Sequence, residues 1–253
     1  MIRTTLLSSL PLLAFAIWGI SWSGRFRPEP ARLDDPRIVR WVAVDALPRE
    51  LALYESVFWE PQDTESLRKM LREKPLARDK SVLEIGTGSG LLAFCCWHAG
   101  ATLVVATDVN PQAIACARAN STRLGAEIDF RRVSSTSTAD LGAFSVIGPE
   151  ERFDLIISNP PWENDTPRQW SEYALYDSSF ALLRSLLDGL REHLRPGGKV
   201  MLVYGRVEAI VVTQRLAADR GLHVVILDQR KPEDLPSVFL PGMLLGLTPD
   251  PLP

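Results

Sequence analysis

Apolar and polar residues alternate in blocks along the chain, and the blocks predict strands and helices in turn. Short apolar runs rich in branched residues are typical of buried strands. They occupy residues 81–86, 102–108, 127–133, 154–158, 199–205, 222–228 and 237–247. Segments with apolar residues at helical spacing lie between them, at residues 64–75, 91–100, 111–125, 177–194 and 208–221. This alternation predicts an α/β fold with seven strands in a mostly parallel sheet and helices on both faces.

The first 24 residues follow a different pattern. Residues 4–24 carry no charge over 21 positions, enough for an apolar helix that just spans a bilayer. One arginine precedes this segment and several follow it, which favours a single-pass membrane anchor with the rest of the chain in the cytoplasm. A cleaved signal peptide with small residues at Ser21 and Ser23, or a buried amphipathic helix in a soluble cytoplasmic protein, would be the alternatives.

The remaining chain divides into an extension and a main domain. Residues 25–52 are rich in Arg, Pro and Asp and are expected to be a linker, although RIVRWVAV could pair or pack locally. Residues 53–253 are expected to form the main domain. In it, Asp63 is the expected N-cap of the helix that Pro75 ends, and Pro241 is expected at a sheet edge or a bulge.

Composition narrows the class of protein. The chain is 46% apolar and 23% charged, as globular domains are, and its net charge of −3 gives no general attraction for nucleic acid. The 3 cysteines lie in apolar or helical contexts without metal-ligand spacing, which favours reduced core thiols and no metal site.

Candidate chemistry follows the ends of three predicted strands, where ligands of parallel sheets bind. After the first strand comes Glu84-Ile85-Gly86-Thr87-Gly88-Ser89-Gly90, whose glycines allow a tight turn with a ligand against the backbone. A plain strand-to-helix turn and a dinucleotide site are the alternatives. The acidic Glu84 and the non-glycine Leu91 disfavour a pyrophosphate ligand and suit a cationic or neutral one.

The second strand ends at Asp108, whose carboxylate could accept both hydroxyls of a ribose or could cap the next helix, a role that Asn110 could also fill. The fourth strand runs into Asn159-Pro160-Pro161-Trp162. A central strand cannot continue through two prolines, so strand and rigid turn meet at Asn159. The sequence therefore predicts one amide side chain held at the sheet edge beside an indole.

These motifs together resemble class I S-adenosylmethionine-dependent methyltransferases. EIGTGSG, ATDVNPQAI and ISNPPW, in this order and spacing, are similar to the Asn-Pro-Pro-aromatic branch, which modifies planar nitrogens and includes the release-factor glutamine methyltransferases and the "methyltransferase small" group. VFWEPQDTESL resembles a Glu-Pro-x-x-Asp-Thr segment of related glutamine methyltransferases. The resemblance covers about residues 56–230 and implies a Rossmann-like fold.

The resemblance also implies roles for residues. S-adenosyl-L-methionine would contact Glu84, Gly86, Thr87, Gly88, Gly90, Asp108, Val109, Asn159 and Thr64. For Thr64, capping of the following helix is an equal alternative. The Asn159 side-chain oxygen and the Pro160 carbonyl would accept hydrogen bonds from the NH2 group to be methylated, making these two the catalytic residues. Pro161 and Trp162 would contact the substrate, with stacking and packing as equal alternatives for the indole.

The acceptor remains open at this level. Trp162 stands where glutamine methyltransferases carry tyrosine, no helical substrate-docking domain is recognisable, and Asp140 is a weak candidate for adenine contact. The resemblance favours N-methylation of a protein glutamine amide or a small planar amine. A nucleic-acid adenine methyltransferase is the alternative acceptor class. Two further classes stay open, an NAD-dependent oxidoreductase and a membrane protein that binds the cofactor without catalysis.

Overall fold

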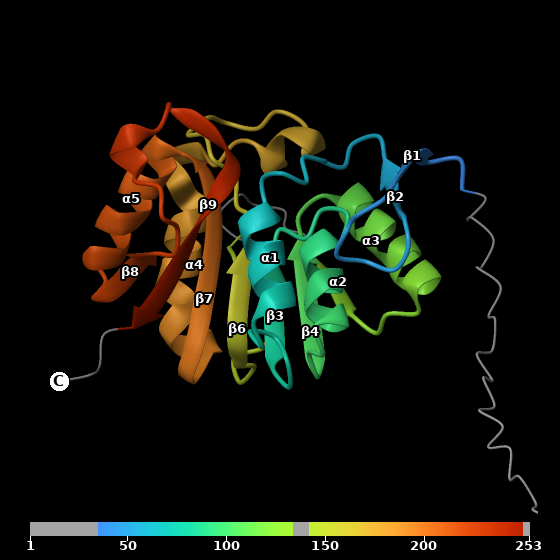
Figure 1. The fold of residues 1–253 in the computed structure, drawn as a ribbon, viewed down its shortest axis with the longest axis horizontal. Helices are drawn as coiled ribbons and strands as arrows, with labels where there is room; N and C mark the ends of the chain where they lie inside the picture. Colours follow the sequence, from blue (N-terminus) through green and yellow to red (C-terminus); the bar gives the residue numbers. More distant parts are fainter. Residues whose placement is uncertain (1–34, 134–141, 250–253) are drawn as a thin grey trace, which may run out of the picture. The chain divides into compact units, whose positions relative to one another are not determined.

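The computed structural model describes residues 35–133 and 142–249, and within them the main sheet has 7 strands in the order β5-β4-β3-β6-β7-β9-β8 (Figure 1). The strands are β3 (Ser81–Ile85), β4 (Leu103–Asp108), β5 (Asp129–Arg132), β6 (Phe153–Ser158), β7 (Leu194–Arg206), β8 (Leu222–Ile226) and β9 (Val238–Pro249). β9 runs antiparallel to both of its neighbours, while the other pairings are parallel. The predicted α/β fold with a mostly parallel sheet is confirmed.

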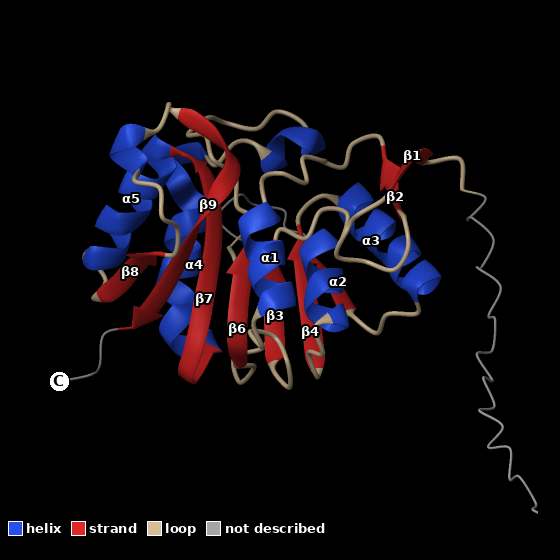
Figure 2. Cartoon of the chain, in the orientation of Figure 1, coloured by secondary structure: helices blue, strands red, loops and turns tan. Residues whose placement is uncertain are grey.

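Helices cover both faces of this sheet, as Figure 2 shows. They are α1 (Glu65–Glu73), α2 (Leu91–His98), α3 (Pro111–Leu124), α4 (Ala181–His193) and α5 (Val207–Ala218), with short 3-10 turns at Trp170–Ala174, Ser178–Phe180 and Pro232–Asp234. Successive strand residues point to opposite faces. Val82 therefore packs in the core beneath α1, α2 and α3, while Leu83 packs in the core beneath α4 and α5.

The closing strand β9 lies inside the sheet, between β7 and β8. The expectation of an edge position for Pro241 is therefore wrong, and that of a bulge is confirmed. Tyr204 pairs with Met243 and Arg206 pairs with Val238, so residues 239–242 oppose a single residue of β7. A proline, which has no N–H for the ladder, fits this interruption.

An antiparallel pair of strands precedes the main sheet. β1 (Ile38–Val42) pairs with β2 (Leu51–Tyr54), which confirms the local pairing expected for RIVRWVAV. β2 is fully buried and packs on α3, where the Cys116 thiol donates to the Ala52 carbonyl at 3.2 Å. The boundary expected between residues 52 and 53 falls inside β2, and the division of the chain into 1–24, 25–52 and 53–253 stays a prediction.

Two expectations fall outside the part of the chain that the structure describes: the apolar helix within residues 1–24, and Asp140 as an adenine contact. Across residues 35–133 and 142–249, no helix combines the length and the apolar character needed to cross a membrane.

Candidate functional site

Three strand ends meet at one edge of the sheet. Ile85 of β3 pairs with Thr107 of β4 on one side and with Ser158 of β6 on the other. The residues that follow, Gly86, Asp108 and Asn159, therefore leave the sheet at the same edge. β3 is also where the strand order reverses, since β4 and β5 lie on one side of it and β6 on the other. Ligands of open α/β sheets bind at such a switch point.

The glycine turn after β3 leaves open space beside its backbone. Gly86 and Gly88 have φ angles of +78° and +54°, and a Cβ built on either would meet nothing within 4 Å. The neighbouring strand β4 fixes the turn, because the Thr107 carbonyl accepts the N–H groups of Gly86 and Thr87, each at 2.9 Å. Gly90, at φ +90°, starts α2. A preformed cradle of this kind fits the close approach of a nucleoside or amino-acid ligand.

Glu84 lies buried beneath this turn, and Thr87 Oγ1 donates to its carboxyl at 2.6 Å. Burial raises the pKa of Glu84 to about 8, a rise to which the charge of Asp108 adds and which the Thr87 hydrogen bond opposes. Without a ligand, burial thus favours the neutral form of the Glu84 carboxyl, and its predicted role toward a ligand stays a prediction. A cationic ligand beside it would favour the charged form.

Asp108 braces the glycine turn. Its Oδ2 accepts the Gly88 N–H and its Oδ1 accepts the Asn110 N–H, both at 2.8 Å, while burial raises its pKa to about 6. The helix cap is Asn110, whose Oδ1 accepts the Gln112 N–H at 2.9 Å. Asp108 thus does not cap α3, and each of its oxygens keeps a lone pair for a ligand hydroxyl. Val109 follows it, half-buried.

Asn159 follows β6 directly and lies beside two side chains. Its Oδ1 accepts the Trp162 indole N–H at 3.2 Å. Burial raises the pKa of the Asp63 carboxyl to about 7, and the neighbouring Asn159 side chain opposes that rise. Pro160 and Pro161 are buried behind it. A Cβ at Gly205 of β7 would overlap the Trp162 ring. The half-buried indole thus packs on β7 with its polar edge toward Asn159, so packing is the interpretation of Trp162 that its contacts favour.

The start of α1 differs from the expectation. Thr64, not Asp63, occupies the N-cap position, and α1 has no side-chain cap. The Asp63 carboxylate is engaged with Asn159 instead, which explains why it does not cap the helix. Thr64 is buried, and its hydroxyl makes only a 3.5 Å contact with the Pro61 carbonyl. Sequence reasoning missed the role of Asp63, although the residue lies in the segment VFWEPQDTESL that carries part of the family resemblance.

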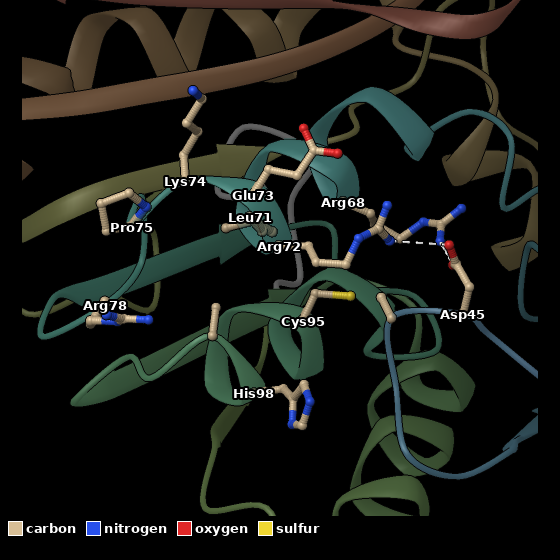
Figure 3. A pocket seen from close by; sticks show the side chains of 12 residues that line it. Asp45, Arg68, Leu71, Arg72, Glu73, Lys74, Pro75, Arg78, Cys95 and His98 are labelled. Carbon is tan, nitrogen blue, oxygen red and sulfur yellow. Dashed lines mark hydrogen bonds and ion pairs between the residues drawn. The ribbon is translucent and has the colours of Figure 1, made fainter.

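A separate cavity of about 480 Å³ opens near the C-terminal ends of α1 and α2 (Figure 3). Basic side chains line it, and two of them, Arg68 and Arg72, pair with Asp45 at 2.6 and 3.1 Å. None of the residues predicted for the site lines this cavity. Over residues 35–133 and 142–249, no group of three His, Cys, Asp or Glu side chains is placed to hold a metal ion.

The fold and the strand-end site together define a class I S-adenosylmethionine-dependent methyltransferase. The chain combines a seven-stranded sheet with one antiparallel strand, a glycine cradle, a half-buried acidic residue at the end of β4, and Asn-Pro-Pro after β6. Within that class, the family model "Methyltransferase small domain" matches residues 62–216, and the chain belongs to this family.

Relatives and solved structures agree with this assignment. The chain is 30% identical over 164 residues to a release factor glutamine methyltransferase of Koribacter versatilis, an alignment that covers 57% of this chain and 53% of the relative. It is 31% identical over 193 residues to the enzyme of that name from Cereibacter sphaeroides, covering 71% and 66%. The chain spans about half the length of the first of these relatives.

Among solved structures, the T. thermophilus 16S rRNA N2 G1207 methyltransferase in complex with AdoMet and guanosine has a TM-score of 0.59 to this chain. The sequences are 19% identical, and the match covers 85% of this chain and 52% of the other. This likeness shows a shared fold. Family and fold together favour a methyltransferase over a nicotinamide-dependent oxidoreductase.

Proposed function

We propose that this protein methylates a side-chain amide nitrogen of a protein glutamine, using S-adenosyl-L-methionine. The observation that carries the proposal is the amide of Asn159, held by the Trp162 indole N–H at the same sheet edge as the glycine cradle and Asp108. The relatives named release factor glutamine methyltransferases favour a protein glutamine as the acceptor. A nucleic-acid amine is a less favoured acceptor, because the chain carries a net charge of −3.

The cofactor would lie along the glycine turn. The cradle at Gly86 and Gly88 leaves room against the backbone, and Asp108 has lone pairs free for ribose hydroxyls. When bound, the cofactor supplies a methyl group on a positively charged sulfur. The remaining residues assigned to it by resemblance are Glu84, Thr87, Gly90, Val109, Asn159 and Thr64.

Asn159 and Pro160 would act on the acceptor nitrogen. An amide nitrogen is a poor nucleophile because its lone pair is delocalised into the carbonyl. Asn159 Oδ1 and the Pro160 carbonyl would accept its two N–H groups, which turns the lone pair toward the methyl group. The cofactor would supply the methyl group and keep the electron pair of the S–C bond. The acceptor nitrogen, held by Asn159 and Pro160, would form the N–C bond and afterwards lose one proton. Catalysis is then alignment and stabilisation of the charge developing on nitrogen.

Transfer of a labelled methyl group to a translation release factor tests this proposal, with mass spectrometry to locate the label. Asn159→Ala should lower the rate by roughly 100-fold while cofactor binding persists, because one aligned acceptor is lost. Asp108→Ala should abolish cofactor binding in calorimetry. Asn164→Ala, the same change at an exposed asparagine, is the matched control. Cofactor binding without label on any glutamine, or label on a nucleic-acid amine instead, would reject the glutamine acceptor.

Attachment to a membrane forms a separate part of the proposal. The 21 uncharged residues 4–24 and the arginines after them support a single-pass anchor with the domain on the cytoplasmic side. The full chain should then sediment with carbonate-washed membranes. Phe15→Arg, which places a charge in the middle of the segment at a cost of about 3 kcal/mol, should release it. Equal sedimentation of both chains, or none of either, would reject the anchor.

A further inference from the structure

The Asn159 side-chain amide lies between two partners of opposite hydrogen-bonding character. On one side the Trp162 indole can only donate, and Asn159 Oδ1 accepts from it at 3.2 Å. On the other side lies the Asp63 carboxyl, whose pKa burial raises and the same Asn159 side chain lowers. An ionised carboxylate can only accept, so the donor there is the Asn159 NH2 group.

This arrangement fixes which way the amide faces. If the amide were flipped, its NH2 would meet the indole N–H and its oxygen would meet the carboxylate. Both contacts would then be repulsive, in a place where an unmatched polar group is costly to bury. Asn159 alone could present either end to a ligand. With both partners in place, only one orientation satisfies all three side chains.

The two partners are themselves held by elements far apart in the sequence. Asp63 precedes α1 and is buried, and a Cβ on Gly242 of β9 would overlap its carbonyl oxygen. Ser66 of α1 fixes the same junction by donating to the Gly242 carbonyl at 2.7 Å. Trp162 lies on Gly205 of β7, where a side chain would displace the ring. The amide is therefore braced from α1 and β9 on one side and from β7 on the other.

We propose that Asp63 and Trp162 are positioning residues, which together hold the Asn159 amide with its oxygen available to the acceptor nitrogen; the catalytic part of this inference rests on the proposed function. Asn159 Oδ1 has two lone pairs, of which the indole takes one and the acceptor N–H takes the other. Asp63 keeps the Asn159 NH2 group turned away from the nitrogen to be methylated. Two N–H donors would otherwise face each other there. Trp162 thus serves the reaction through its N–H group, while its ring packs on β7.

Two conservative variants weaken these contacts with little change of shape. Asp63→Asn removes the negative charge and leaves a weaker, neutral acceptor that can also present a donor, and Trp162→Phe keeps an aromatic ring without the N–H. Assays at pH 8 keep Asp63 ionised, above its pKa of about 7. Asp188→Asn, which alters an exposed ion pair with Arg220, and Trp97→Phe on α2 are the matched controls. Thermal melting checks that each variant is folded.

We expect Asp63→Asn to lower kcat by roughly 100-fold and Trp162→Phe by roughly 10-fold, with cofactor Kd unchanged, since misalignment of a reacting group costs rate rather than cofactor affinity. In an Asn159→Ala background, neither change should lower kcat further, because no amide remains to be held. Additive losses there, or a cofactor affinity that falls in step with kcat, would overturn the proposal and indicate a general structural role.

A second measurement needs no acceptor substrate. The side-chain NH2 signals of Asn159 in a ¹⁵N–¹H spectrum are identified by their loss in Asn159→Ala. They should shift in Asp63→Asn and in Trp162→Phe, and stay in place in both controls. Unmoved signals in both variants overturn the proposal. Shifted signals in a protein that methylates no glutamine would keep the positioning role and reject the proposed function, so the two can fail separately.

Discussion

Gly205 of β7 has no side chain and therefore leaves room for the Trp162 ring. It lies on β7 under the Trp162 ring, and a Cβ there would overlap both the ring and the Phe239 carbonyl oxygen. The indole can contact Asn159 only because no side chain at position 205 occupies the space of the ring. The sequence alone gives no sign of this, since Gly205 looks like an ordinary residue at the end of a strand.

Gly205→Ala should therefore displace the indole. We expect a loss of stability of about 1–3 kcal/mol from overpacking and a fall in kcat similar to that of Trp162→Phe. Tryptophan fluorescence, denaturant unfolding and methyl transfer measure the three effects. Gly246→Ala on β9 is the control, because its Cβ would meet the flexible Leu227 side chain first, at 3.1 Å. An unchanged rate in Gly205→Ala would mean that the position of the indole is immaterial.

Asn120 joins separate parts of the fold at the scale of whole elements. This fully buried side chain of α3 accepts the Ala52 N–H at 2.7 Å, and it donates to the carbonyls of Ala52 and Ser89 at 3.0 and 3.1 Å. One amide thus ties β2 to the glycine turn. Asn110 adds a second tie, by donating to the Ser56 carbonyl at 3.0 Å. The β1–β2 pair is consequently part of the support for the glycine turn.

Asn120→Ala should remove the side-chain partner of the Ala52 N–H and of the Ser89 carbonyl in the core, while the Ala52 carbonyl keeps the Cys116 thiol. We expect a loss of about 3 kcal/mol in the free energy of unfolding, from the cost of burying unsatisfied polar groups. Cofactor binding should weaken as well, because Ser89 belongs to the turn. Denaturant unfolding and calorimetry test this, and Thr122→Ala, an exposed position on the same helix, should change stability by less than about 0.5 kcal/mol. Equal stability of the two variants would contradict this role for Asn120.

Elements set by local pattern could be predicted from the sequence, and those set by long-range contacts could not. The apolar runs predict each strand from β3 to β9, and the motifs place Gly86, Asp108 and Asn159 at one sheet edge. The interior position of β9 depends on pairing with two strands distant from it in sequence. Asp63 has the pattern of a helix cap, because a polar residue just before a helix usually has that role. Its interaction with Asn159 is a contact between residues 96 positions apart (159 − 63), which no local pattern indicates.

For the molecule as a whole, the strand-end carboxyls make stability depend on pH. Burial raises the pKa of Asp108 to about 6, of Asp63 to about 7 and of Glu84 to about 8, from ordinary values of 3.8 and 4.5. At pH values between the ordinary and the raised pKa of each carboxyl, that group stays protonated in the folded protein and is ionised in the unfolded chain. Their contribution to stability is therefore complete below the ordinary values and is lost as the pH rises through the raised ones.

Without cofactor, the Tm should accordingly fall as the pH rises from 5 to 8. Glu151, whose pKa Arg131 lowers to about 2, acts in the opposite direction but below pH 4.5, outside this window. Glu84→Gln should reduce the fall of Tm between about pH 7 and pH 8, whereas Glu192→Gln, at an exposed position, should not. Melting curves at several pH values test the slope. A Tm that rises over this range would contradict the raised pKa values.

The position of β9 has a consequence for the order in which the protein is made. β9 is synthesised after every other strand of the sheet, yet it pairs on both sides, and its Gly242 supports the junction that carries Asp63. A nascent chain on the ribosome that has emerged only as far as β8 lacks this support. The cofactor cradle around β3 and β4 is encoded more than a hundred residues earlier and can form first. We therefore expect the glycine turn proposed to bind the cofactor to form before Asp63 is fixed beside Asn159.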